Sequence, residues 1–297
     1  MLTPRITVAA FMLMLMTATC YAVGLPDATV IDKLTGVKGK ANEKEGVYKV
    51  QVPRSELKVK VAGAKVTPPM GLTSWAAFKK AGEETMVMGD MVLQEDQIDP
   101  VMDAALNNGL QVTGLHNHFT FDNPRIMFMH IGGMGSEADL AAAVGKVFAA
   151  VKETAGGKAK HVTTHVDPAK SKLTTSKLET LLGKGEMKDG VYKVTIGRTT
   201  KMHGHEAGKE MGVNTWAAFA GTDDKAVVDG DFAMRESELQ DVLKALRKGG
   251  LSIVAIHNHM TFEEPRIIFL HFWGAGRPEE LAKGVKGALA KTAHYEQ

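Results

Sequence analysis

The sequence predicts an α+β fold made of two tandem homologous domains, each a mostly antiparallel sheet with two or three helices. Three observations predict it. The chain repeats itself, most of each copy alternates between apolar and polar residues as strands do, and the helical segments do not alternate strictly with the strands. Two compact domains in series follow from these observations.

The repeat appears when the sequence is shifted by 141 residues against itself. Residues 71–140 then match residues 212–281 without a gap, with 26 identities in 70 positions. The copies predict a first domain at 27–151 and a second at 174–297, each of ordinary domain size. Between them, 152–173 is rich in Lys, Gly and Thr and poor in large apolar residues, which is typical of a linker.

Periodicity gives the elements of each copy. In the first copy, a helix is expected over 99–109, with Asp99 as N-cap, Pro100 at the first helical position and Gly109 just past the end. Its counterpart in the second copy would take Ser237 as cap. A closing helix is expected from apolar residues at helical spacing in 136–151. Strands are expected at 47–52, 57–63, 73–80, 85–93, 110–118 and 125–133.

Composition and the N-terminus limit the function classes. The chain has 297 residues with 36 basic and 34 acidic side chains, so no charge excess suggests nucleic-acid binding. Residues 1–22 combine Arg5, an apolar run and small residues, as a secretory signal peptide does, and the run is too short for a transmembrane span. Cleavage after Ala22 is favoured over lipid attachment at Cys20, and it predicts an exported, periplasmic or extracellular protein without cysteine.

One string occurs twice with all its histidines. LHNHFTFDNPRIMFMH at 115–130 matches IHNHMTFEEPRIIFLH at 256–271, and the 15 positions of 116–130 hold ten of the identities. This window has therefore diverged least between the copies. It supplies the six candidate metal ligands, His116, His118, His130, His257, His259 and His271.

Strand geometry can bring three of these histidines together. His116 and His118 share one face of a strand because side chains alternate. If 121–125 is the connecting loop, His130 is expected directly opposite His116 on the next strand, with His118 on the diagonal. A register shift of two residues would move His130 one pair further along. Convergence therefore depends on the register.

Three imidazoles with a fourth position left to water form a catalytic zinc site. Zinc lowers the pKa of its bound water to about 7 and supplies hydroxide at neutral pH. A carboxylate would move protons or orient a ligand ring, with Glu95 or Asp90 as candidates in the first copy and Glu236 or Asp231 in the second. The planar guanidinium groups of Arg125 and Arg266 could bind an anionic substrate.

Each assignment has a structural alternative. The histidines could be hydrogen-bonded polar structure on a sheet. Glu95 and Glu236 would start a helix, where a carboxylate complements the dipole. Asp90 and Asp231 each follow a glycine and are interpreted first as turn residues. Arg125 and Arg266 fit an internal ion pair as well as a substrate clamp.

Several other features point elsewhere. The contiguous letters HNH do not match the widely spaced nuclease motif of that name. Methionines beside histidines suggest Cu(I), which thioethers suit, but Met127 and Met129 become Ile268 and Leu270, as core positions do. A second-copy pair, His203 and His205, replaces two alanines and indicates either specialisation or an exposed strand. The pair His161 and His165 lies in the predicted linker.

The strings HNHMTFEEPRIIFLHFWG, NTWAAFAGTDDKAVVDGDF and GVYKVTIGR resemble a bacterial family of exported proteins, homologues of the mycobacterial lipoproteins LppY and LpqO. The resemblance covers nearly all of the mature chain and implies export, without implying an activity. The weak lipobox before Cys20 departs from the named lipoproteins.

Together these features predict an exported tandem metalloprotein. It would hold zinc in each copy, with a hydrolase or lyase activity on a small or anionic substrate. The alternatives are a non-catalytic envelope protein that binds zinc, copper or another ligand, and structural histidine triads with a surface role.

Overall fold

The computed structural model describes residues 24–157 and 163–293. In the first repeat the elements are α1 (Ala28–Thr35), β1 (Lys40–Asn42), β2 (Val47–Pro53), β3 (Lys60–Val61), β4 (Ala64–Lys65), β5 (Thr73–Ala81), β6 (Glu84–Gln94), α2 (Ile98–Asn107), β7 (Gln111–Asn117), β8 (Asp122–Asn123), β9 (Ile126–Gly135) and α3 (Glu137–Glu153). Short 3-10 turns, η1 (Pro68–Met70) and η2 (Glu95–Gln97), precede β5 and α2.

The second repeat follows the same order. Its elements are α4 (Thr175–Leu182), β10 (Glu186–Lys188), β11 (Val191–Gly197), β12 (Thr200–Met202), β13 (His205–Ala207), η4 (Lys209–Met211), β14 (Asn214–Gly221), β15 (Ala226–Arg235), η5 (Glu236–Glu238), α5 (Leu239–Lys248), β16 (Ser252–His257), β17 (Glu263–Glu264), β18 (Ile267–Gly276) and α6 (Pro278–Leu289). A further turn, η3 (Pro168–Lys170), lies between the repeats.

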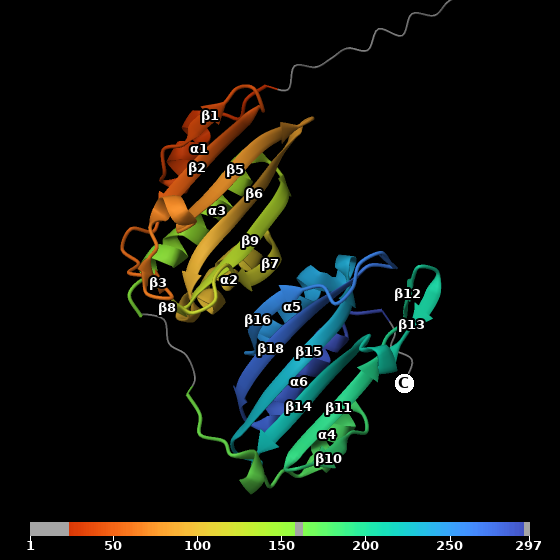
Figure 1. The fold of residues 1–297 in the computed structure, drawn as a ribbon. Coiled ribbons are helices and arrows are strands. Elements are labelled where there is room, and N and C mark those ends of the chain that lie inside the picture. The colour runs from red at the N-terminus through yellow and green to blue at the C-terminus, as the bar shows by residue number, and fades with distance from the viewer. Residues whose placement is uncertain (1–23, 158–162, 294–297) are drawn as a thin grey trace, which may run out of the picture.

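The two repeats share one antiparallel sheet. Its order is β1-β2-β5-β6-β9-β7-β16-β18-β15-β14-β11-β10, so the edge strands β7 and β16 of the two repeats meet in the middle. In Figure 1 the strands pass in front of the helices in both repeats, which leaves one broad sheet face without helices. We call this helix-free side the open face.

The main core lies between the sheet and the helices. Alternate residues of β6, such as Val87 and Met91, are fully buried there with Val144 and Val147 of α3. The helix α3 begins at Ser136, whose hydroxyl accepts a hydrogen bond from the Asp139 backbone N–H, as an N-cap does. Because side chains alternate along a strand, the intervening residues of β6 lie on the open face.

Small hairpins cover one end of the open face. In the first repeat β3, β4 and β8 form a three-stranded sheet, and β12, β13 and β17 form its counterpart. Beneath the first hairpin, Val59 and Leu72 pack on Val92, Ile126 and Phe128 of the main sheet. The hairpins therefore bury the open face at the ends of β6 and β9 and leave the rest of it accessible.

The seam between the repeats has local two-fold symmetry. Leu115 of β7 pairs with Ile256 of β16, and these two residues are counterparts in the duplication, 141 positions apart. On the helix side, Arg247 of α5 bonds to Asp103 of α2 at 2.8 Å from Nε and 3.0 Å from Nη2, and its Nη1 lies 2.8 Å from Asp99. The side chain of Arg247 is only 13% exposed. This ion-pair network joins α2 of the first repeat to α5 of the second on the helix side of the seam.

The α+β fold of two tandem repeats is confirmed, with three helices in each repeat, and three local predictions were wrong. Asp99 does not cap α2, which begins at Ile98 after Gln97, because its carboxylate bonds to Arg247 and to the Ser252 hydroxyl. Ser237 lies within η5 and does not cap α5. The strand expected at 57–63 shrinks to β3, and the helices α1 and α4 were not expected.

Some other predictions concern residues that the structure does not describe, or describes only in part. The predicted signal peptide and Cys20 lie outside the described residues, as does His161. The predicted linker is partly ordered, since Lys172 donates its backbone N–H to the Gly221 carbonyl of the second repeat.

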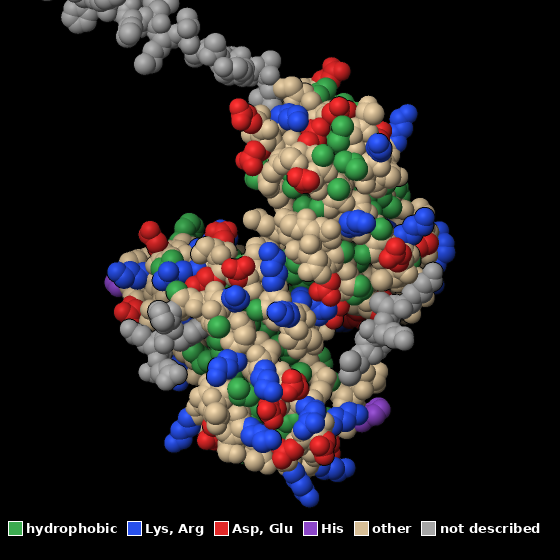
Figure 2. All heavy atoms as spheres, turned by 180° about the vertical axis from the view of Figure 1, so that it is seen from behind, with side chains coloured by type: hydrophobic (Ala, Val, Ile, Leu, Met, Phe, Trp, Pro, Cys, Tyr) green, Lys and Arg blue, Asp and Glu red, His purple; other side chains and the backbone are tan. Residues whose placement is uncertain are grey.

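Figure 2, a view of the helix side, shows acidic and basic side chains interspersed on that face. Among the described residues, no helix is both long and apolar enough to span a membrane.

Candidate metal centre

The histidines of the repeated string lie on the open face. Leu115 and Met129 are fully buried in the main core, so the alternating neighbours His116 and His130 face the other way. The same alternation applies to β16 and β18 in the second repeat. Because Leu115 and Ile256 pair across the seam, the two histidine clusters lie on neighbouring strands of one face.

The predicted register was wrong by one pair. His130 faces Gly114, and His116 faces Phe128, because β7 ends at Asn117 and the connection to β9 spans 118–125, longer than the predicted loop at 121–125. The imidazoles still meet on the diagonal, with 2.8 Å between His116 Nε2 and His130 Nε2. A Cβ on Gly114 would lie 3.0 Å from the His130 ring, so this glycine gives the ring its room.

The third histidine is fixed by an aromatic ring. His118 follows the last residue of β7, and its ring stacks on Phe128 with 3.3 Å between centroids and an angle of 2°. Phe128 is fully buried in the small core under the hairpin. The centroids of His116 and His118 are 5.2 Å apart, so all three rings gather at one place.

The second repeat reproduces the cluster with small differences. His259 stacks on Phe269 at 3.5 Å, and its Nε2 lies 3.1 Å from His257 Nε2. The ring centroids of His257 and His271 are 4.7 Å apart. His271 faces Ala255, the counterpart of Gly114. The same cluster therefore occurs in both repeats, and it is built from the residues that diverged least between them.

A buried aspartate joins each cluster. Asp90 of β6 faces His130 and Asp231 of β15 faces His271, so neither is the turn residue that the preceding glycine suggested. Asp231 Oδ2 lies 3.4 Å from His259 Nε2, and Asp90 Oδ1 lies 3.7 Å from His130 Nδ1. Only 8% of Asp90 and 4% of Asp231 is exposed. Among the described residues, Oδ1 of each carboxylate is buried without a hydrogen-bond partner.

The electrostatics of this arrangement favour a cation. Burial raises the pKa of Asp231 to about 6, against the opposing effect of His271. Burial likewise raises the pKa of Asp90, while His130 works against it. Burial lowers the pKa of His257 to about 4 with help from His271 and His259. Neutral imidazoles beside a desolvated carboxylate are the protonation states that metal ligands need.

In the second repeat, the spacing of the donor atoms fits a small metal ion. Ligand atoms about 2.0 to 2.1 Å from a tetrahedral zinc are about 3.3 Å from each other. The 3.1 Å between His257 and His259 and the 3.4 Å between His259 and Asp231 are close to that value. One ligand atom from each of these three residues lies within 4.8 Å of the others. His271 borders the same space.

Among the described contacts, no hydrogen bond, ion pair or ring contact joins the other predicted site residues to the histidines. Glu95 Oε1 and Arg125 Nη1 form an ion pair at 3.8 Å, and each side chain is 64% exposed. Asp90 lies five residues before Glu95, which is about 16 Å along a strand. Glu236 and Arg266 are both exposed, and no ion pair joins them among the described contacts. A catalytic role for these four residues stays a prediction.

The remaining histidines are peripheral. His203 lies at the tip of the β12-β13 hairpin with a positive φ of 50°, and its ring is 5.9 Å from that of Phe262. His205 and His165 are exposed. The exposed-strand interpretation of His203 and His205 therefore fits their surroundings.

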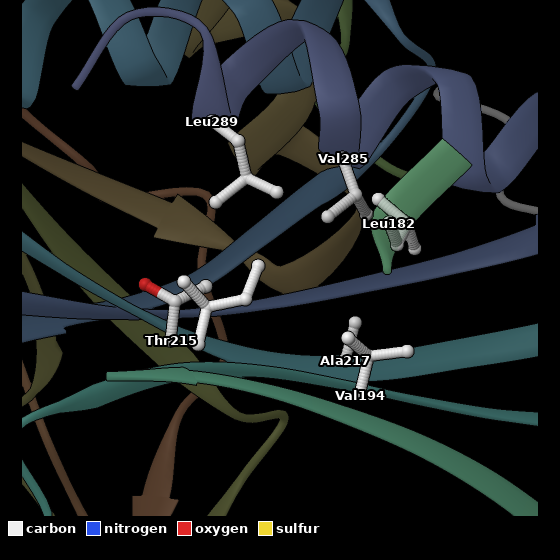
Figure 3. Close-up of a pocket in the computed structure, with 7 residues that line it drawn as sticks. Leu182, Val194, Thr215, Ala217, Val285 and Leu289 are labelled. Carbon is white, nitrogen blue, oxygen red and sulfur yellow. The ribbon is translucent and has the colours of Figure 1, made fainter. Parts of the chain in front are cut away.

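A small apolar gap lies on the opposite side of the sheet. In Figure 3, Val285 and Leu289 of α6 point down toward Val194, Thr215 and Ala217. The cavity has a volume of about 10 Å³, about the space that one water molecule occupies. It is a packing gap in the core and is separate from the histidines.

Comparison with known proteins gives a family without an assigned activity. The model of the Domain of Unknown Function (DUF1259) matches residues 29–150 and again 176–291. No curated protein matches the sequence. A solved structure, the trimeric bacterial microcompartment shell protein PduB, aligns with 85% of this chain and 89% of its own at 12% identity, with a TM-score of 0.20. The two matches of the family model show that the chain belongs to the DUF1259 family, as a tandem duplication of its domain.

Proposed function

We propose that this protein binds metal ions, one in each repeat, through three histidines and one aspartate. Zn²⁺ is the first candidate ion, and copper is the alternative. The ligands are His116, His118, His130 and Asp90 in the first centre, and His257, His259, His271 and Asp231 in the second. The observation that carries the proposal is a buried carboxylate oxygen without a hydrogen-bond partner beside converging imidazoles, present in both repeats.

A purely structural triad explains this observation poorly. A buried carboxylate costs several kcal/mol unless a partner compensates it, and an adjacent hydrogen-bond donor would be the simple solution. Among the described contacts, the histidine nitrogens that face Oδ1 of Asp90 and of Asp231 lie 3.7 and 3.9 Å away, beyond hydrogen-bond distance. A divalent cation satisfies the carboxylate and the facing nitrogens together.

Whether Asp231 binds the metal directly determines whether the metal has a binding role or a catalytic role. If Asp231 binds the ion with three histidines, the tetrahedral shell is complete, and the protein stores, carries or is stabilised by the metal. If Asp231 only orients a histidine ring, a water molecule takes the fourth position, and hydrolase or lyase chemistry on a small or anionic substrate becomes available. The 3.4 Å between Asp231 and His259 favours direct ligation in the second repeat.

Metal analysis of the mature protein, residues 23–297, tests the proposal. We expect two ions per chain in the wild type, one in the double variant His116→Ala/His118→Ala, and one in His257→Ala/His259→Ala. The variant His203→Ala/His205→Ala removes two exposed histidines and should keep both ions. Equal metal content in all four proteins would overturn the proposal.

A second experiment separates binder from enzyme. Co²⁺ in place of the native ion gives a visible spectrum that reports the coordination number, and water relaxation reports an exchangeable ligand. A closed four-ligand shell would support the binding role. An exchangeable water would support catalysis, to be followed by esterase, phosphatase and amidase assays. Export, which rests on residues 1–22, is tested by the N-terminal sequence of the protein from the cell envelope, expected to begin at Val23.

A further inference from the structure

The open face of the first repeat carries a group of methionines that the metal centre does not use. Met86 and Met88 of β6 and Met134 of β9 are 36%, 58% and 53% exposed. They lie on the same face as Asp90 and His130, because their positions alternate with buried residues. Single exposed apolar side chains are common, but three adjacent methionines that are all at least a third exposed need an explanation.

The strand register brings the three methionines together around a glycine. Met86 faces Met134, and Met88 faces Gly132. A Cβ on Gly132 would meet only one atom within 4 Å, the Val87 carbonyl oxygen at 3.6 Å, so the space above this glycine is open. Cβ atoms of facing residues are about 4.5 to 5.5 Å apart, and methionine turns about three side-chain bonds. The three sulfur atoms can therefore reach one point above Gly132.

We propose that Met86, Met88 and Met134 form a binding site for Cu(I), with the ion held above Gly132. Thioether sulfur is a soft, uncharged ligand that selects Cu(I) over zinc and over the hard divalent ions. The site needs no change in the oxidation state of the ion, and it uses none of the ligands of the proposed histidine centres. The Cu(I) site can therefore be tested independently of the histidine centres.

The second repeat lacks every part of this site. The counterparts of the three methionines are Val227, Asp229 and Ala275, and Trp273 occupies the position of Gly132. Trp273 faces Asp229 in the β15-β18 ladder and is 40% exposed, so an indole replaces the open space. The repeats have the same histidine cluster and different neighbours beside it. Cu(I) binding through sulfur is expected once per chain, in the first repeat.

Competition for Cu(I) tests the site directly. Mature protein loaded with zinc is titrated with Cu(I) without oxygen in the presence of bicinchoninate, and X-ray absorption reports the ligand atoms. We expect one Cu(I) per chain, with sulfur in its first shell. The variant Met86→Leu/Met88→Leu/Met134→Leu should retain none at the same competitor concentration. Leucine preserves the volume and apolar character of methionine, so this variant keeps the fold.

Two further variants make the test specific. Met70→Leu/Met211→Leu removes two methionines that are 58% and 69% exposed elsewhere, and should bind Cu(I) as the wild type does. Gly132→Trp keeps all three sulfur atoms, fills the space above the glycine as the second repeat does, and should abolish binding. Unchanged Cu(I) binding in the triple leucine variant, or a first shell of nitrogen alone, would overturn the proposal. In the variant with His116, His118, His257 and His259 all changed to Ala, the sulfur-bound Cu(I) should remain, and its loss there would also overturn it.

Discussion

Replacing Asp231 by asparagine should stabilise the metal-free protein. Asp231 is 4% exposed, and its Oδ1 has no hydrogen-bond partner among the described residues. Asparagine has nearly the same shape and no charge, so it removes the cost of a buried anion. A residue that improves the fold when it is lost is expected at a site that serves a ligand.

The pKa of Asp231 sets the size and the pH range of the effect. Burial raises this pKa from 3.8 to about 6, and one pKa unit corresponds to about 1.4 kcal/mol. The folded state therefore loses up to about 3 kcal/mol through Asp231 at pH 7. Below pH 3.8 the carboxyl group is protonated in both the folded and the unfolded state, and the cost vanishes. The loss grows as the pH rises from 3.8 through 6.

Urea denaturation of the metal-free wild type and Asp231→Asn measures this directly. We expect the free energy of unfolding of the variant to be higher by about 1 to 3 kcal/mol at pH 7, and the two proteins to be equal near pH 3.5. The exposed control Asp224→Asn should change little at either pH. With zinc bound, the order should reverse, because the variant loses a ligand. A variant that is less stable than the metal-free wild type at pH 7 would refute this reasoning.

Three further predictions test the surroundings of the site. In Gly114→Val the branched side chain displaces the His130 ring, so metal analysis should show one ion lost, whereas Gly114→Ala, which copies Ala255, should keep both. Arg247→Ala leaves Asp99 and Asp103 without their partner at the seam and should lower the free energy of unfolding by about 3 kcal/mol in urea; an unchanged value would mean that the network does not hold the repeats together. Because burial lowers the pKa of His118, His257 and His259, protons should displace the metal only well below pH 6.5, and equilibrium dialysis that found full release at pH 6.5 would contradict this.

Much of the fold could be predicted because the duplication doubled the signal. The strands 73–80 and 85–93 correspond to β5 and β6, and Gly109 lies just past α2 with a positive φ of 83°. The unexpected helix α1 had a readable sequence signal. Asp27 accepts two backbone N–H groups at its start, and Gly36 ends it in the left-handed region, as helix caps do.

The candidate site was predictable in its histidines and not in its geometry. Alternation alone places His116 and His130 on one face, but the length of the connection after Asn117, which sets their register, has no clear sequence signal. Asp90 was misinterpreted because a Gly-Asp pair is typical of turns, whereas here the glycine lies within β6 under a close neighbouring strand. The pairing of Leu115 with Ile256 depends on contacts distant in sequence, and it determines that both clusters share one face.

The methionines illustrate how one observation misled the sequence interpretation. Met129 is a core residue, as its replacement by Leu270 indicated, and Met127 packs partly against the same core. Met86, Met88 and Met134 lie on the other face, and only the register of β6 with β9 brings them together. In the sequence, this cluster is indicated only by differences between the two copies, for example Gly132 in the first copy and Trp273 in the second.

The number of metal ions bound per chain tests the central claim most directly. Protein of residues 23–297, purified without added metal, reconstituted with Zn²⁺ and dialysed, is measured by elemental mass spectrometry against protein concentration. Two converging clusters of histidine and aspartate predict two zinc ions in the wild type and none when His116, His118, His257 and His259 are all changed to alanine. A wild type that retains no metal, or a quadruple variant that retains two ions, would contradict the account.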